Sequence, residues 1–161
     1  MKDNTTNRAF QTLVRNAFPS DEKSRINLIE YISSSDHELA LKVANFFSDK
    51  AWTDLNLQEL NQQFESDSGL AFYILPENER RIFLPTILWY HCTDAPEISG
   101  FEYVLENTLS EFIGEYHQLS KGLSRDQLAV SMSILAYVCV EDWQVPSDKN
   151  LAAFIRLING H

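Results

Sequence analysis

The chain has 161 residues, of which 44% are hydrophobic, 12% aromatic and 22% charged, and its 13 Lys and Arg against 23 Asp and Glu give a formal charge of −10. A chain of this length buries about two-thirds of its unfolded surface, so one core can form without disulfides or a metal. The low content of Gly and Pro, five of each, weighs against collagen-like, linker-like and turn-dense all-β chains. The prediction is therefore one domain over residues 1–161.

The sequence indicates neither secretion nor insertion into a membrane. Its first residues, MKDNTTNRAF, lack the apolar core of about 7–15 residues that follows a basic start in a secretory signal. The longest apolar stretches without Asp, Glu, Lys or Arg, residues 82–93 and 127–140, are shorter than the roughly 20 residues of a membrane span. Cys92 and Cys139 lie in these stretches, where a reduced cysteine packs as a small hydrophobe. We expect a cytoplasmic protein with reduced cysteines.

The N-terminal part of the chain predicts three helices, from apolar spacing and capping signals. The first has apolar side chains at positions i, i+3, i+4 and i+8 before a proline that ends it: Phe10, Leu13, Val14, Phe18 and then Pro19. A second helix is predicted over residues 21–32. A third begins at the capping box of Ser35 and Glu38. Its inward face is formed by Leu39, Val43, Phe46 and Phe47.

A fourth, short helix follows a break in the apolar pattern at residues 49–53. Asn56 and Glu59 repeat the capping arrangement, and the helix is predicted to end near Gly69. The apolar run at residues 72–75 lies between a glycine and a proline and has no partner strand in the sequence. We predict an extended or coil segment there.

The centre of the chain is a helical pattern over residues 77–91 that contains Pro85. Either the helix is kinked at Pro85, or a new helix begins with this proline in its first turn. The residues around Pro85 are apolar nearly all round, which predicts a central buried element.

Three further helices are predicted in the C-terminal part. An amphipathic face formed by Ile98, Phe101, Leu105, Leu109 and Phe112 ends at Gly114. Ser124 and Gln127 form a third capping box and open a buried helix over residues 125–142. A last helix follows Pro146 and ends at Gly160. Together the elements predict an all-α fold, a single compact orthogonal bundle of about seven to eight helices with at most one short extended segment near residues 72–75.

The negative charge is concentrated in the middle of the chain. Residues 1–50 contain seven acidic and seven basic residues, and residues 121–161 contain four of each. Between these balanced flanks are twelve acidic residues against only Arg80 and Arg81. One interpretation is a negative surface that attracts and orients a basic protein, and the other is a solvated face that maintains solubility. The same field excludes nucleic acid as a partner, because phosphates are repelled.

The predicted partner-binding residues are the acidic side chains of this middle segment: Asp94, Glu97, Glu102, Glu106, Glu111 and Glu115. Glu102 with Glu106, and Glu111 with Glu115, are like-charge pairs at i and i+4, and each such pair destabilises an isolated helix by a few tenths of a kcal/mol. Selection for helix stability alone would favour alternating signs at these positions.

The residue patterns of most catalytic and cofactor sites are missing from the sequence. Its four histidines are scattered, its five glycines are isolated, and no metal-binding or phosphate-cradling motif occurs. We therefore predict neither a metal nor a cofactor. His91, Cys92 and Asp94 offer the one possible nucleophile pattern, a thiol activated by an imidazole. Neighbouring residues on a helix point about 100° apart, so the side chains of His91 and Cys92 cannot hydrogen-bond to each other in a regular helix. A histidine at a helix end beside a buried cysteine is therefore the favoured interpretation. Trp89 is interpreted as core packing, as are Trp52 and Trp143.

Residues 52–137 contain a set of mostly apolar motifs: Trp52-x-x-Leu55, Leu60, Phe72-Tyr73-x-Leu75-Pro76, Arg81-Ile82-Phe83-Leu84-Pro85 and Leu123-Ser124-x-x-Gln127. With these motifs, this part of the chain resembles a family of small all-helical bacterial proteins, a domain of unknown function with a Trp turn and a Leu-Pro core segment. These motifs are structural and transfer no catalytic residue. In type, such proteins are similar to the acidic immunity proteins encoded beside bacterial toxins.

The first hypothesis for function is a non-enzymatic, cytoplasmic protein-binding module, an immunity protein that blocks a basic toxin, such as a nuclease, through the acidic face. The second is a small enzyme or ligand-binding protein with a pocket near Trp89, His91 and Cys92, which predicts a reactive Cys92. The third is a structural subunit of a larger assembly, which predicts an exposed apolar patch. The sequence does not indicate an oligomeric state.

Overall fold

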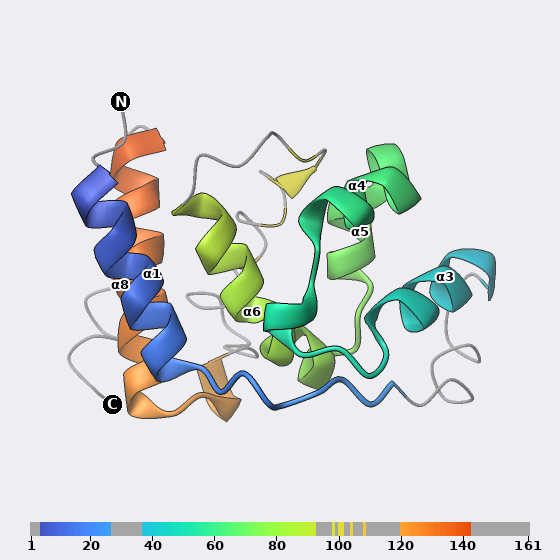
Figure 1. Cartoon of the computed structure of the whole chain (residues 1–161), viewed down its shortest axis with the longest axis horizontal. Coiled ribbons are helices and arrows are strands. Elements are labelled where there is room, and N and C mark those ends of the chain that lie inside the picture. Colours follow the sequence, from blue (N-terminus) through green and yellow to red (C-terminus); the bar gives the residue numbers. More distant parts are fainter. Residues whose placement is uncertain are drawn as a thin grey trace. The chain divides into compact units, whose positions relative to one another are not determined.

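The structure is a computed structural model (Figure 1) that describes residues 4–26, 37–92, 98, 100, 101, 104, 108 and 120–142. All regular structure in these residues is helical, and no β-strand occurs among them. The α-helices are α1 (Asn4–Ala17), α3 (His37–Phe47), α4 (Leu57–Phe64), α5 (Ser68–Tyr73), α6 (Glu77–His91) and α8 (Arg125–Asp142). Three 3₁₀ turns accompany them: η1 (Trp52–Asp54), η2 (Glu65–Asp67) and η3 (Ser120–Gly122). The all-α prediction is confirmed, and a total of seven to eight helices stays a prediction.

The chain groups into two compact units. The first comprises Met1–Pro19, Leu88–Ala95 and Asn107–His161, and the second comprises Ser20–Ile87 and Pro96–Glu106. Each unit is described by itself below. A single domain over residues 1–161 stays a prediction.

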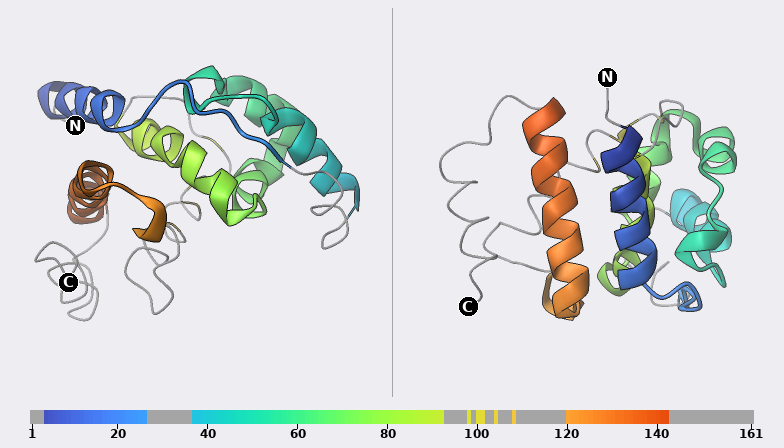
Figure 2. Two further views of the ribbon diagram at one scale, coloured as in Figure 1. Left: turned by 90° about the horizontal axis from the view of Figure 1, so that it is seen from below. Right: turned by 60° about the vertical axis from the view of Figure 1, so that its left-hand side comes forward.

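The first unit is organised around α1 and α8, which lie side by side and run antiparallel (Figures 1 and 2). Val14 and Phe18 are buried as predicted, and the Phe10 ring lies 5.1 Å from the Tyr137 ring. Leu13 is 43% exposed, so the predicted inward face of α1 is wrong at this position. Leu13 points about 100° away from Val14 around the helix axis. It therefore lies outside the buried stripe of α1, which contains Asn7 and Val14 and continues to Phe18.

The N-terminus of α8 carries the predicted capping box. The Ser124 backbone N–H donates to Gln127 Oε1 at 2.9 Å, and the Gln127 backbone N–H donates to Ser124 Oγ at 3.2 Å. Two amides that lack partners within the helix are thereby satisfied. Ile134 and Leu135 are fully buried further along α8, as predicted for a central helix.

The second unit has an aromatic core centred on Phe47. Its ring lies 5.1 Å from Phe46, 5.2 Å from Phe72 and 5.0 Å from Phe83, in edge-to-face arrangements. Such aromatic pairs add about 0.5–1.5 kcal/mol each beyond the area they bury. Phe72 extends the cluster to Phe101, at 5.3 Å. These contacts join α3, α5 and α6 to the residues that follow α6.

The helix predicted over residues 21–32 is wrong at its start, because residues 21–26 are not helical. Their backbone amides bond to other segments of the unit instead. The Ser24 N–H donates to the Lys50 carbonyl at 3.0 Å, the Asp49 N–H donates to the Ser24 carbonyl at 3.1 Å, and the Arg25 N–H donates to Glu79 Oε2 at 3.1 Å. A backbone that pairs in this way cannot also make the i to i+4 bonds of a helix. The remainder of the predicted helix lies outside the described residues.

The extended or coil segment predicted near residues 72–75 is wrong at Phe72 and Tyr73, which belong to α5, whereas residues 74 and 75 follow the helix and are not helical. Ser68, Ala71, Phe72 and Leu75 are buried, at the spacing of one helical face. Gly69 allows this short helix to approach another backbone segment closely, since a Cβ there would lie 2.4 Å from the Gly100 carbonyl oxygen. The close approach of the two backbones places Phe72 on the aromatic cluster.

One continuous helix, α6, contains Pro85, so the alternative in which a new helix begins at this proline is wrong. Phe83, Leu84 and Ile87 are buried, and their packing maintains the helix through the position where Pro85 lacks an amide donor. None of the helices in the described part combines the length and the apolar composition needed to cross a bilayer.

Candidate functional site

The six acidic residues predicted to bind a partner lie outside the described residues. They are Asp94, Glu97, Glu102, Glu106, Glu111 and Glu115. Two members of the apolar face that accompanies them, Ile98 and Phe101, are buried as predicted. The acidic surface itself therefore stays a prediction for residues 94–115.

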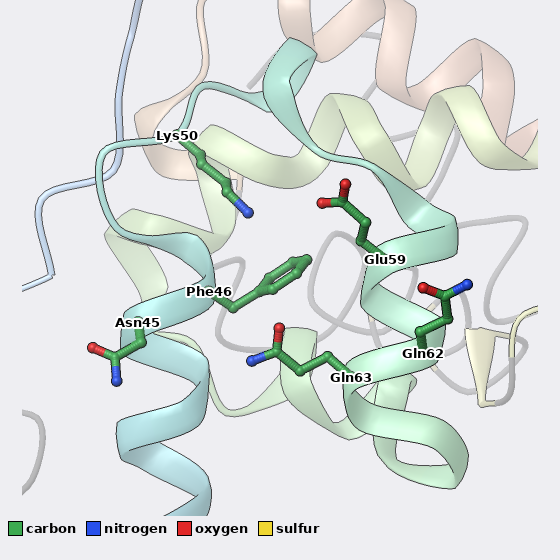
Figure 3. A pocket seen from close by; sticks show the side chains of 6 residues that line it. All are labelled: Asn45, Phe46, Lys50, Glu59, Gln62 and Gln63. Carbon is green, nitrogen blue, oxygen red and sulfur yellow. The ribbon is translucent and has the colours of Figure 1, made fainter.

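The described residues contain a different candidate site, a pocket of about 460 Å³ between α3 and α4 in the second unit. It is open to solvent. Figure 3 shows the side chains of Phe46, Lys50 and Glu59 directed toward the same space, with Gln63 beside the Phe46 ring. The lining residues are Asn45, Phe46, Lys50, Glu59, Gln62 and Gln63.

The two walls of the pocket are set by helix ends that the sequence encodes locally. Asn56 begins α4 by accepting from the backbone N–H groups of Gln58 at 2.9 Å and Glu59 at 3.3 Å. Asp49 adopts a φ of 59° where the chain leaves α3. An aspartate tolerates this left-handed conformation better than most side chains. The chain can therefore turn sharply between the two helices.

A cation lies over the aromatic floor of the pocket. Lys50 Nζ is 3.8 Å from the centre of the Phe46 ring, within the range of a cation–π contact. The ring is fixed by edge contacts with Phe47 at 5.1 Å and with Phe64 at 5.5 Å. Phe46 is only 5% exposed, so the ring presents one covered face to the ammonium group.

Apart from Lys50, the polar side chains that line the pocket are acidic or neutral. Glu59 is exposed, and its carboxylate has no ion-pair or hydrogen-bond partner among the described residues. Gln62 and Gln63 supply amide groups that both donate and accept hydrogen bonds. The pocket can thus bind a positive group by the Phe46 ring, one carboxylate and neutral acceptors.

Exposed acidic side chains continue from the pocket along the adjacent segment. Glu65 and Asp67, in η2, are exposed and form no ion pair within the described part of the chain. No Lys or Arg occurs in residues 51–79. The Arg81 side chain contacts Glu77 on α6. The surface formed by Glu59, Glu65 and Asp67, which we call the α4–η2 acidic surface, therefore has no basic residue of its own segment to neutralise it.

The alternative centre near Cys92 is packed in the first unit. Cys92 is a fully buried thiol, and its carbonyl accepts from Gln11 Nε2 at 3.0 Å. The Arg15 guanidinium lies 4.7 Å from the centre of the Trp89 ring. Trp52, in the second unit, is buried at 7% exposure, as predicted for core packing. Trp143 lies outside the described residues.

The described residues contain no group of three His, Cys, Asp or Glu side chains placed to hold a metal ion. Glu79, a buried acidic residue, accepts from the Arg25 N–H at 3.1 Å and from Asn78 Nδ2 at 3.0 Å. These bonds give Glu79 a structural role, because they attach the segment before α3 to the first turn of α6.

Sequence reasoning did not find the α3–α4 pocket. It assigned Phe46 to the core of a helix and Lys50 to a break between helices, and neither residue carried a functional signal. The available signal was the placement of Lys50 four residues after Phe46, followed by 29 residues without a base. The pairing of α3 with α4 is tertiary, so the pocket does not follow from either segment alone.

Comparisons of the chain with protein-family models, with curated proteins and with solved structures find no match.

Proposed function

We propose that this protein is a non-enzymatic module that binds a basic protein through an acidic surface. The observation that carries the proposal is the α4–η2 acidic surface, where Glu59, Glu65 and Asp67 are exposed without ion-pair partners in the described residues. Acidic groups left unpaired on a surface create a field that attracts positive charge. Residues 82–120 also lack Lys and Arg, so they add to the net negative charge of the chain.

The finer proposal concerns the partner. We infer an immunity protein of the bacterial cytoplasm that blocks a basic toxin, such as a nuclease, by occupying the Lys and Arg side chains that the toxin uses for phosphates. The resemblance to a family of small bacterial proteins supports this proposal by type only. Electrostatic complementarity would act mainly on the association rate and on the choice of partner.

Charge reversal of the α4–η2 acidic surface tests the proposal. Glu65→Lys with Asp67→Lys changes the formal charge from −10 to −6, and it should slow association with a basic partner about tenfold at low salt. Asp21→Lys with Glu22→Lys makes the same change of charge at two exposed positions outside the acidic middle. This pair is the matched control.

The measurement is capture of partners from lysate at low and high salt, followed by association kinetics with the retained protein. A basic protein that is released by salt, lost by the Glu65/Asp67 variant and retained by the control supports the proposal. Equal retention by both variants would show that the α4–η2 acidic surface does not bind the partner. A retained protein that is acidic or insensitive to salt would contradict the electrostatic mechanism.

A further inference from the structure

We propose that the α3–α4 pocket receives a Lys or Arg side chain of the basic partner, and that Lys50 occupies this place until the partner displaces it. The inference rests on the proposed function and adds a specific anchor to it. The site is formed by the Phe46 ring, the Glu59 carboxylate and the amides of Gln62 and Gln63 (Figure 3).

The position of Lys50 indicates that the pocket accommodates a cationic group. Its Nζ lies 3.8 Å from the centre of the Phe46 ring, so the chain itself places an ammonium group on this ring. Edge contacts with Phe47 and Phe64 fix the ring orientation. A preformed aromatic face is a general means of binding cations, because the ring quadrupole attracts positive charge at little cost in reorganisation.

The side chain of Lys50 can leave without disturbing the fold. The Lys50 backbone is anchored, since its N–H donates to the Phe47 carbonyl at 3.3 Å and its carbonyl accepts from the Ser24 N–H at 3.0 Å. By contrast, Nζ has no ion-pair or hydrogen-bond partner in the described residues, and its ring contact is the one interaction that holds it. The flexible stem of a lysine allows the ammonium group to move into water while the backbone stays in place.

Charge decides which kind of group replaces Lys50. Once Lys50 has moved out, Glu59 is the charged side chain that remains in the pocket lining, with Glu65 and Asp67 exposed beyond it on the α4–η2 acidic surface. An incoming anion would be repelled, and a neutral group would not gain from the field. A cationic side chain gains the ring contact and the carboxylate together, and this selects Lys or Arg.

The test uses the full chain and a fluorescently labelled hexalysine amide, titrated at low salt and followed by anisotropy. Lys50→Met removes the internal competitor, whereas Lys23→Met removes an exposed positive charge of the same unit that does not line the pocket. Lys50→Met should bind hexalysine about threefold more tightly than Lys23→Met, the factor expected for a cation–π contact at an exposed site.

A second matched pair tests the carboxylate. Glu59→Gln should weaken hexalysine binding about threefold relative to Glu65→Gln, which makes the same change of charge outside the pocket lining. Both positions are exposed, so these variants are expected to fold. Adding Phe46→Leu to Lys50→Met should abolish the gain in affinity, and urea unfolding of this double variant shows whether the fold is retained.

The outcomes separate the inference from the function on which it rests. If Lys50→Met and Lys23→Met bind hexalysine equally, or if Glu59→Gln and Glu65→Gln do, the pocket inference is overturned. Salt-sensitive binding by all four would then leave the acidic-surface proposal in place. Absence of any hexalysine binding by the unsubstituted protein at low salt would overturn both.

Discussion

The contact between Gly69 and Gly100 gives the sharpest prediction. For Gly69→Ala, helix propensity and tertiary packing predict changes of opposite sign in the free energy of unfolding. Gly69 is within α5, and a glycine to alanine substitution in a helix normally stabilises by about 1 kcal/mol. A Cβ at this position, however, would lie 2.4 Å from the Gly100 carbonyl oxygen and 2.6 Å from its carbonyl carbon. Both atoms belong to the backbone and cannot rotate away.

The cost of relieving this overlap exceeds the gain in propensity. Ordinary contacts with a Cβ begin near 3.4 Å, so the two segments must separate by about 1 Å in a packed core, and overpacking of this kind costs about 3 kcal/mol at the upper end of its usual range. Subtracting about 1 kcal/mol for propensity leaves a net loss of about 2 kcal/mol for Gly69→Ala. For a chain of this size that corresponds to a melting temperature lower by about 4–8 °C.

Urea unfolding followed by tryptophan fluorescence measures this loss, and Trp52, which is buried in the same unit, contributes to the signal. Leu70→Ala is the control, since Leu70 is the next residue of α5 and is 43% exposed; its free energy of unfolding should change by less than about 0.5 kcal/mol. A Gly69→Ala protein as stable as the unsubstituted chain, or more stable, would refute the close approach of the two backbones.

Three further predictions concern single contacts. Glu79→Ala should lower the free energy of unfolding by about 2–3 kcal/mol, because it leaves a cavity and removes the acceptor of the Arg25 N–H; Glu79→Gln should cost less, and equal losses would argue against the hydrogen bonds. Ser124→Ala should cost about 1 kcal/mol through the lost cap of α8, measured by thermal unfolding, whereas an effect no larger than that of Ser133→Ala, exposed on the same helix, would contradict the role of the cap. Cys92 should react with a thiol reagent only on unfolding, because it is fully buried, and rapid labelling of the folded protein at Cys92 would instead support the enzyme hypothesis.

The sequence was most informative where short-range chemistry sets the structure. Ser124 and Gln127 are three residues apart and satisfy each other's backbone amides, and Asn56 caps α4 through the two amides that follow it. The bonds involved close within one helical turn, so their geometry depends little on the rest of the chain. The buried helix around Pro85 was also predicted from neighbouring residues, because the side chains on all sides of this proline are apolar.

The predictions were wrong where the conformation of a segment depends on residues outside that segment. Residues 21–26 carry helix-compatible side chains, yet the amides of Ser24 and Arg25 bond to Lys50 and Glu79. The run at residues 72–75 was interpreted by its four apolar side chains, while the helix depends on a wider window that begins at Ser68. For residues 21–26, contacts across tens of residues outweigh a weak local preference. For residues 72–75, the helical face that begins at Ser68 outweighs the short apolar run.

The candidate site shows the same division. The order of residues in the sequence alone shows that the acidic residues concentrate in the middle of the chain, because the formal charge of a segment depends only on which residues it contains. The α3–α4 pocket was decided by tertiary structure, since Phe46 and Lys50 on one side meet Glu59 and Gln63 on the other only after α3 and α4 pack. Most helices, their caps and the sign of the charge can therefore be predicted from residues close together in the sequence. The place where a cation can bind depends on side chains that folding brings together.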